Sequence, residues 1–551
     1  MSPALKVPTD FLLGSWVVAM AVLMLGLAHA WNRATLGTLV VLLAAVAWKR
    51  MVPSSWGALW PSLLASLIVL PIALAPPFFY DALVYHLSLP WQALRAGGLS
   101  PHPEDLFAAF PPLAQLVYAP ALSFGLDRIP AVVHLAGFVA AGAAVWALAR
   151  ALGATRWAAA LAAGCLLLLP CQVLVPALPA AEAWALGGTV AAVALLAQPG
   201  WRPGTAAFAG FLIGVAGAAR MQGIPWAGVL MAAVVLRTRD VREGLRVGLG
   251  FIVGSSPWWL KNAILLHDPL APLLWHREGI ETLWRDAGSA MHTVTGAGNL
   301  ARVTLATLVP QASYLAPLAL AAGITLLARR GGRGRIVALV CLAGVGSWAL
   351  TGNLPRFLAP PVALLLALAA AASGRSAAGR LAAGLALGTT LALGALVSVR
   401  ELHRWGGLAL ASEAPAQVRS ALVVDDPFPA FAAARSLPPK ARVLFVGEPR
   451  GFGFPRRFVT PSQVDVSPLR SVLEVSPGPR EACDLLRRQR FTHILVNWGE
   501  LNRLAGGYPV APWRDLAGWR RWNAFIAWLG PPVVEAGPVQ IFALPASGGN
   551  V

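Results

Sequence analysis

The stretch GTAAFAGFLIGVAGAARMQGIPWAGVLMAAVVLRTRD, residues 204–240, decides the fold class. It contains two apolar runs, 204–219 and 223–236, which are separated by a short turn at Arg220 and followed by a basic cluster. A bilayer core about 30 Å thick is crossed by about 20 mostly apolar residues in a helix. Two such runs with charges only at their ends predict a pair of membrane-spanning helices.

The same pattern recurs over the first 400 residues. Hydrophobic residues make up 57% of the 551 residues and charged residues only 12%, which is too few charges for a soluble chain of this length. We therefore predict an α-helical polytopic membrane protein with about thirteen spans. The predicted spans are residues 10–30, 33–48, 57–76, 130–149, 157–176, 181–198, 204–219, 223–236, 243–260, 302–327, 336–352, 357–373 and 381–399.

The charges between these runs predict the orientation. With the N-terminus inside, the inner loops hold mainly arginine, such as Arg150 and Arg375, whereas acids and bases mix in the outer loops. This asymmetry satisfies the positive-inside rule and predicts a cytoplasmic N-terminus. A full span at 112–125 would reverse everything after it, so we expect an interfacial helix there. An odd number of spans then places the C-terminal part outside.

After Arg400 the chain changes to short mixed segments, so we divide it into a membrane domain, 1–400, and a soluble domain, 401–551. The runs 443–447, 493–498 and 539–544 are typical of buried strands, and 479–490 of a helix between two of them. We expect a small extracytoplasmic α/β domain. The glycines after the first strand lack the spacing of a nucleotide-binding loop. The net charge is +19, but the excess basic residues lie mainly in the predicted inner loops. The charge therefore does not indicate a nucleic-acid partner.

The segment PPFFYDALVYHLSLPWQAL, residues 76–94, opens the predicted outer loop 77–129. Asp81 follows an apolar span directly, and in a continuous helix Asp81, Tyr85 and Leu89 would share one face. A carboxylate at this depth could act on a substrate at the membrane surface. It could equally serve as a helix cap, because Asp is a favoured capping residue.

Four motifs in order resemble those of the GT-C superfamily of membrane glycosyltransferases. They are Asp81 followed by Phe110-Pro111-Pro112-Leu113, GFLIGVAGAARMQGIP at 210–225, PWWLKNAILLHDPLAPLLW at 257–275, and TGNLPRFLAP at 351–360. Two features depart from the family pattern. Two spans precede the one that leads into the outer loop, and Ala82 stands where a second acid is usual.

The resemblance implies a fold and an activity. We expect a GT-C-like membrane domain that transfers a sugar, with inversion, from a polyprenyl-phosphate carrier to an acceptor lipid, polysaccharide or protein. The reaction would take place on the periplasmic face of a bacterial inner membrane, with Asp81 as the general base. We expect no cofactor besides the lipid-linked donor, and the sequence leaves the metal requirement and the oligomeric state open.

The other expected site residues would bind substrate. Fixed cations near the membrane surface would stabilise a leaving phosphate, and the candidates are Arg220, Lys261 and Arg356. These side chains could instead extend toward lipid headgroups. Glu182 would orient the acceptor or cap its helix. Tyr85 and His86 would contact substrate, although a lone outer histidine is more often an ordinary loop residue.

Two other function classes remain open at this stage. A transporter or lipid flippase would need polar groups within the spans or broken paired helices, and the predicted spans are almost free of charge. A non-catalytic scaffold or sensor with an outer domain would leave Asp81 without a role.

Overall fold

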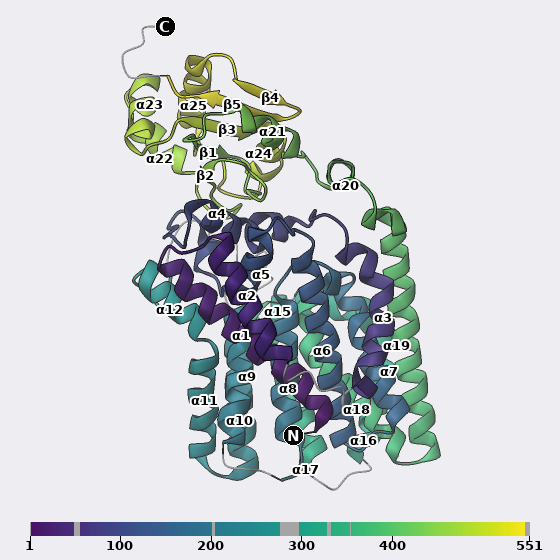
Figure 1. Ribbon diagram of the computed structural model, residues 1–551. Coiled ribbons are helices and arrows are strands. Elements are labelled where there is room, and N and C mark those ends of the chain that lie inside the picture. The colour runs from purple at the N-terminus through teal and green to yellow at the C-terminus, as the bar shows by residue number, and fades with distance from the viewer. Residues whose placement is uncertain are drawn as a thin grey trace.

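The computed structural model describes residues 2–48, 56–200, 204–275, 297–327, 332–352 and 354–545. A body of long helices carries a small sheet-containing domain at one end, and the N-terminus lies at the other end of the body (Figure 1). The predicted fold class, a helical membrane protein with a small C-terminal α/β domain, is confirmed.

The body contains helices from both halves of the chain. They are α1 (Pro3–Leu27), α2 (Arg33–Trp48), α3 (Trp56–Ala73), α6 (Ile129–Ala151), α7 (Arg156–Leu167), α8 (Glu182–Ala197), α9 (Thr205–Ala219), α10 (Gly223–Thr238), α11 (Val241–Gly254), α12 (Ser256–Leu265), α15 (Ala297–Leu308), α16 (Ala312–Leu327), α17 (Gly332–Thr351), α18 (Ala359–Ala371) and α19 (Ala377–Arg404). Among the described residues, six helices are long and apolar enough to cross a membrane. The number of thirteen spans stays a prediction.

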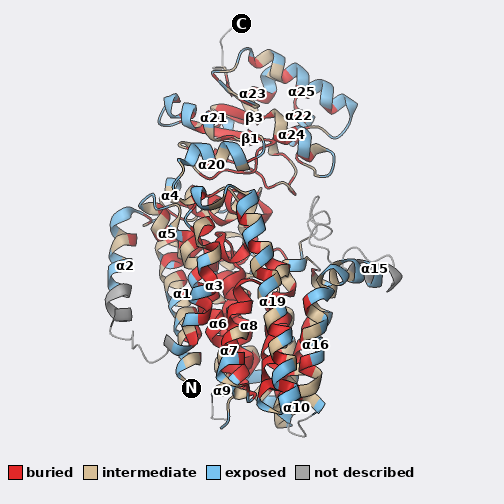
Figure 2. Ribbon diagram, turned by 90° about the vertical axis from the view of Figure 1, so that its right-hand side faces the viewer, coloured by how far each residue is buried: buried red, intermediate tan, exposed pale blue. Residues whose placement is uncertain are grey.

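Burial divides these helices into a central and a peripheral set (Figure 2). In α6, 78% of the most apolar window is buried, against 33% in α19. The outer face of α19 carries exposed leucines such as Leu381, Leu385 and Leu396. A continuous apolar outer surface of this kind is stable only against lipid.

Two predicted spans are shorter than expected, for the same physical reason. The span predicted at 157–176 ends as α7 at Leu167, and 3-10 turns follow at Pro170–Gln172 and Val175–Ala177. The span predicted at 243–260 is divided into α11 and α12, and Pro257 lies in the first turn of α12. Proline lacks an N–H donor and clashes with the preceding turn, so it ends a helix or begins a new one.

Close backbone contact joins α9 to α11. A side chain at Gly210 would overlap the carbonyl oxygen of Val247, and one at Gly250 would overlap the carbonyl oxygen of Ala207. Glycine at these positions lets the two helix backbones approach each other, as is typical of helix pairs in membranes.

The C-terminal domain contains a five-stranded sheet in the order β2-β1-β3-β5-β4. Its strands are β1 (Arg442–Val446), β2 (Arg457–Val459), β3 (His493–Asn497), β4 (Val534–Ala536) and β5 (Val539–Ala543), and β1 is parallel to β2 and β3. Six helices accompany it: α20 (Pro415–Leu422), α21 (Phe428–Ala433), α22 (Pro468–Val475), α23 (Pro479–Arg488), α24 (Trp498–Ala505) and α25 (Leu516–Leu529). The predicted strands near 443, 493 and 539 and the helix near 479 are present, whereas the three-residue strands β2 and β4 were not predicted.

The outer loop folds into short helices between the body and this domain (Figure 1). It contains a π-helical turn (Ala82–His86), α4 (Ser88–Ala96), a 3-10 turn (Leu106–Ala109) and α5 (Leu113–Ser123). The 11 residues of α5 extend about 16 Å, too short for a span. A π-helical turn interrupts the helix predicted for Asp81, Tyr85 and Leu89, yet Tyr85 and Leu89 still pack against one apolar cluster.

Hydrogen bonds fasten the C-terminal domain to this loop. The Trp91 indole donates to the carbonyl of Phe454 at 3.0 Å, and the Leu106 amide donates to the Asp465 carboxylate at 2.9 Å. The hydroxyl of Tyr80 donates to Oε1 of Glu500 at 2.9 Å. Burial raises the pKa of the Tyr80 phenol, so the group remains a donor at neutral pH.

Glu500 belongs to a buried ion cluster. Arg450 donates two bonds of 2.7 Å to Glu448 and lies 3.9 Å from Glu500, and all three side chains are at most 2% exposed. Asn497 also donates to Glu448, at 2.6 Å. Charges buried in this way are costly unless paired and fully hydrogen-bonded, so the cluster holds the docking surface in one arrangement.

The first prediction concerns helix packing. Gly210→Ala should lower the melting temperature of the purified protein, because overpacking a close contact costs about 1–3 kcal/mol. Gly228→Ala in α10 is the matched control, since a side chain there would meet nothing within 4 Å. Equal melting temperatures for both variants would contradict the close contact.

The second prediction concerns domain docking. Tyr80→Phe should speed amide hydrogen exchange in residues 83–91 by about tenfold or more, because a hydrogen bond to a charged group contributes about 1.5–3 kcal/mol. Tyr314→Phe in α16 makes the same chemical change inside the helical body and should leave this exchange unaltered. An unchanged exchange rate in Tyr80→Phe would show that the bond does not hold the domain.

Candidate active site

A cavity of about 230 Å³ lies where the helical body, the outer loop and the C-terminal domain meet. Asp81, Tyr85 and His86 line it from the loop, and Arg220 and Arg356 line it from the body. Three of the four motifs, which are far apart in sequence, therefore converge at one place.

Asp81 lies at the start of the π-helical turn, but its carboxylate makes no capping hydrogen bond. Its Oδ2 instead accepts a bond of 3.0 Å from Nη2 of Arg356. The capping role considered for this residue is not seen. Asp81 is 22% exposed, so the carboxylate is paired with a cation and still open to the cavity.

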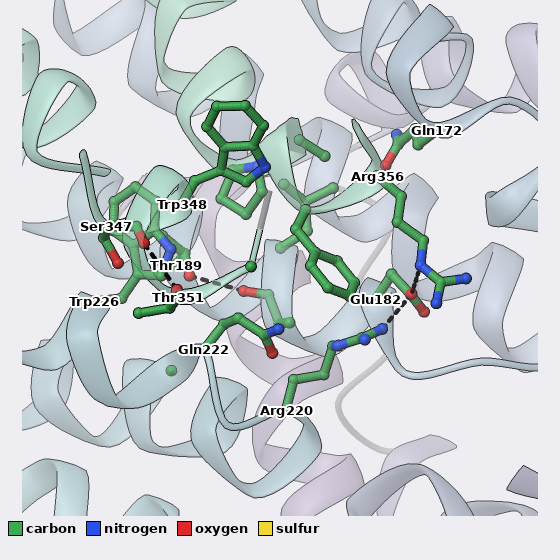
Figure 3. A pocket seen from close by; sticks show the side chains of 17 residues that line it. Gln172, Glu182, Thr189, Arg220, Gln222, Trp226, Ser347, Trp348, Thr351 and Arg356 are labelled. Atoms are coloured by element: carbon green, nitrogen blue, oxygen red, sulfur yellow. Dashed lines mark hydrogen bonds and ion pairs between the residues drawn. The ribbon is translucent and has the colours of Figure 1, made fainter. Parts of the chain in front are cut away.

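Glu182 lies between the two arginines (Figure 3). Its Oε1 accepts a hydrogen bond from Nη1 of Arg220 and lies 3.7 Å from Nε of Arg356, and its Oε2 accepts from the Ala181 amide at 3.0 Å. With Asp81, these groups form a line in which carboxylates and guanidinium groups alternate. The two arginines turn toward carboxylates, so they do not extend to lipid headgroups.

The local sequence explains where these side chains emerge. Arg220 is the residue that ends α9, where its backbone becomes extended. Arg356 lies in a 3-10 turn, Pro355–Leu358, directly before α18, and Glu182 opens α8. The ring of Phe357 lies under both guanidinium groups, 4.4 Å from Arg220 and 5.3 Å from Arg356. Each charge therefore sits at the end of an apolar helix, where it avoids the membrane interior.

A second, smaller cavity of about 40 Å³ continues from the same residues into the helical body (Figure 3). It shares Glu182, Arg220 and Arg356 with the first cavity and runs between α8, α10 and α17. Trp226 and Trp348 form part of its wall. The charged residues thus lie between the smaller cavity, which leads into the body, and the larger cavity beneath the C-terminal domain.

Tyr85 and His86 lie where a substrate-contact role requires. The ring of Tyr85 is 4.2 Å from that of His86 and 4.6 Å from that of Phe107. Burial lowers the pKa of His86 to about 3, so the imidazole is neutral at physiological pH and a poor proton acceptor. Of the groups on this loop, Asp81 remains the better candidate for a base.

Lys261 differs from the expected phosphate contact. Its ammonium donates to the carbonyls of Ala108 and, at 2.8 Å, of Phe110, and the residue is 5% exposed. Asn262 donates to the neighbouring carbonyl of Ala109 at 2.9 Å. Lys261 does not line either cavity. It secures the backbone before Pro111, and we leave it out of the proposed phosphate site.

Several lining residues were not predicted. Gln463, Val464 and Tyr508 of the C-terminal domain line the larger cavity, as do Thr351 and Phe357 of the body. No motif in the sequence marks the three residues of the domain, because their place depends on how the domain docks. Among the described residues, no group of three or more His, Cys, Asp or Glu side chains could hold a metal ion.

Comparisons with known proteins identify the fold. No protein-family model and no curated protein matches the chain. ArnT from Cupriavidus metallidurans in the apo state matches with a TM-score of 0.51 and 16% identity, covering 91% of this chain and 98% of that one. The apo oligosaccharyltransferase from Archaeoglobus fulgidus matches with a TM-score of 0.50 and 14% identity, covering 84% and 72%.

These likenesses define the class of the protein by its fold. The chain is a polytopic membrane protein with a GT-C-like fold, similar to the folds of ArnT and of the oligosaccharyltransferase, as the order of the sequence motifs predicted. ArnT from Cupriavidus metallidurans bound to undecaprenyl phosphate also matches, with a TM-score of 0.48 and 15% identity over 90% of this chain and 99% of that one.

Proposed function

We propose that this protein is a glycosyltransferase that moves a sugar from a polyprenyl-phosphate carrier to an acceptor hydroxyl. The observation that carries the proposal is the line Asp81, Arg356, Glu182 and Arg220, in which a candidate base directly contacts a candidate phosphate-binding cation. Transfer of a sugar from a phosphate carrier requires a base and a phosphate-binding cation that are no farther apart than the length of one sugar.

The charges of this line suit a leaving phosphate. Two arginines face two carboxylates, and the guanidinium groups carry donors beyond those used in these ion pairs. A phosphate beside this line, facing the guanidinium donors that Glu182 and Asp81 leave unused, would accept charge-assisted hydrogen bonds from both Arg220 and Arg356. Those bonds would strengthen as the carrier phosphate gains negative charge, which is the condition for lowering a reaction barrier.

The proposed chemical step is a single displacement. The acceptor oxygen attacks the anomeric carbon from the side opposite the phosphate, and Asp81 takes the proton of the acceptor hydroxyl. The new carbon–oxygen bond forms as the bond to the phosphate oxygen breaks, and its electron pair leaves with the phosphate. Attack from the opposite side inverts the anomeric configuration.

The path of the carrier lipid follows from the smaller cavity. This cavity begins at Arg220 and Arg356 and continues between α8, α10 and α17, with Trp226 and Trp348 in its wall. A phosphate held by the arginines would direct its polyprenyl chain along this path into the membrane. ArnT, whose apo form has a similar fold, is also described with undecaprenyl phosphate bound.

The proposed location is the inner membrane of a bacterium. The asymmetric distribution of arginine favours a cytoplasmic N-terminus. The C-terminal domain lies at the opposite end of the body from the N-terminus (Figure 1), which would place it and the Asp81 cavity on the periplasmic side. A lipid, polysaccharide or protein acceptor would meet the carrier there.

The third prediction tests the base. Asp81→Asn should reduce transfer by about 10²- to 10⁴-fold, the range typical of a lost general base, and should leave binding of undecaprenyl phosphate within the range of the wild type. Transfer is measured with the member of a panel of undecaprenyl-phosphate sugars that the wild type uses. Asp127→Asn is the control, because that carboxylate pairs with Arg419 outside the cavity. Full transfer by Asp81→Asn would refute the assignment.

The fourth prediction tests the cations. Arg356→Ala and Arg220→Ala should each weaken binding of undecaprenyl phosphate by roughly ten- to a hundredfold, because each removes a charge-assisted hydrogen bond. Arg95→Ala is the matched control, since Arg95 is an exposed residue of α4 that faces neither cavity. Unchanged affinity in both site variants would contradict the phosphate site.

The same assay separates the transporter or flippase alternative. Such a protein would move undecaprenyl-phosphate sugar between the leaflets of a proteoliposome and release it chemically unchanged. Sugar movement that survives Asp81→Asn, with no transfer product in any reaction, would favour that alternative.

A further inference from the structure

The C-terminal domain forms one wall of the larger cavity, away from the helix ends that carry Arg220 and Arg356. This wall consists of Gln463, Val464 and Tyr508. The cations lie on the other side, at the ends of α9 and before α18. A donor phosphate would occupy the cationic side, so the second substrate would meet the domain.

Gln463 presents an unused hydrogen-bonding group at this wall. Its Oε1 atom is buried and has no hydrogen-bond partner in the part of the chain that the structure describes. Buried polar atoms are normally satisfied, and an exception requires an explanation such as a bound ligand. A hydroxyl donor in the cavity would satisfy this oxygen.

The segment that carries Gln463 is held firmly. The Asp465 carboxylate accepts hydrogen bonds from the amide and the hydroxyl of Ser462, and from the amide of Leu106 in the outer loop at 2.9 Å. In the sequence, Gln463 therefore lies between Ser462 and Asp465, which are hydrogen-bonded to each other. Asp465 is also hydrogen-bonded to the outer loop. A backbone fixed in this way holds Gln463 at one place in the cavity wall, so less freedom is lost on binding than for a residue of a mobile loop.

The remaining surfaces of the cavity indicate the chemistry of this ligand. Tyr85, Phe107 and Phe110 present aromatic rings, with ring centres 4.6 Å and 5.1 Å apart along the series. A saccharide ring offers C–H faces to aromatic rings and hydroxyl groups to an amide.

The charges exclude an anionic second substrate. The charged residues that line this cavity are Asp81, Arg220 and Arg356, and both arginines are paired with carboxylates and are assigned to the donor phosphate. No further cation lines the described cavity to receive a phosphate or carboxylate on the second substrate. A neutral hydroxyl compound fits these groups.

We propose that Gln463 and Tyr508 form an acceptor subsite for a neutral saccharide, and that they direct one of its hydroxyl groups toward Asp81. This inference rests on the proposed glycosyltransferase function and specifies its acceptor. Gln463 is a specificity residue, because it contacts the acceptor and takes no part in proton or sugar transfer.

The test uses the full-length protein in lipid nanodiscs free of sugar-based detergents. Undecaprenyl phosphate is added to saturation, and methyl glycosides of glucose, mannose and N-acetylglucosamine are then titrated, with binding followed by saturation-transfer-difference NMR. At least one glycoside should bind the wild type. Gln463→Ala should weaken that binding by roughly two- to tenfold, as expected for one lost hydrogen bond.

Gln489→Ala is the matched control, because Gln489 is an exposed residue at the end of α23 and lines neither cavity. Tyr508→Phe keeps the aromatic ring and its packing, and it should weaken glycoside binding. Neither site variant should alter the affinity for undecaprenyl phosphate.

The outcomes distinguish the two proposals. If undecaprenyl phosphate binds but no glycoside does, or if Gln463→Ala and Tyr508→Phe bind glycosides as well as the wild type, the acceptor subsite is refuted. If undecaprenyl phosphate does not bind the wild type, the proposed donor is refuted, and glycoside binding that depends on Gln463 would still support a saccharide site.

Discussion

A charge at the edge of a lipid bilayer is stable only when another charge or water compensates it, and this constraint organises the structure. Asp81, Glu182, Arg220 and Arg356 come from four segments of an apolar body, and each lies at the end or the start of a helix. Their pairing joins these segments at one end of the body. Separating one member would leave its partner unpaired in a partly buried setting, which is far more costly than the pair itself.

The C-terminal domain adds a second layer of support to the same place. Tyr80, the residue before Asp81, is bonded to Glu500, which belongs to the buried cluster of Glu448 and Arg450. The backbone that carries Asp81 is thereby attached to the domain on one side, while its side chain is attached to Arg356 on the other. Catalytic groups held from two sides keep a productive geometry without rearrangement during the reaction.

The sequence predicted the parts of this structure that depend on local patterns. Long apolar runs predicted the helices, and short apolar runs bounded by turns predicted β1, β3 and β5. The motifs marked Asp81, Arg220 and Arg356, and the position of Glu182 at the start of a predicted span marked the fourth residue of the site. Contacts between segments that are distant in the sequence could not be predicted from it. The carbonyls that bind Lys261 belong to a loop whose path depends on tertiary packing, and Gln463 reaches the cavity only because the domain docks. The π-helical turn at Ala82–His86 has no pattern of its own in the sequence.

The contact between α9 and α11 also limits how this molecule can change shape. Backbone touches backbone at Gly210 and Gly250, so no side chain there can swing aside, and the two helices must move as one unit that carries Arg220. The contact between α10 and α17 is different, because the Trp226 indole packs against Gly344. This contact is made by a side chain, which can change rotamer without a shift of the helix backbone. On the proposed function, a long isoprenoid would enter from the bilayer through the contact between α10 and α17, while Arg220 keeps its position at the end of α9.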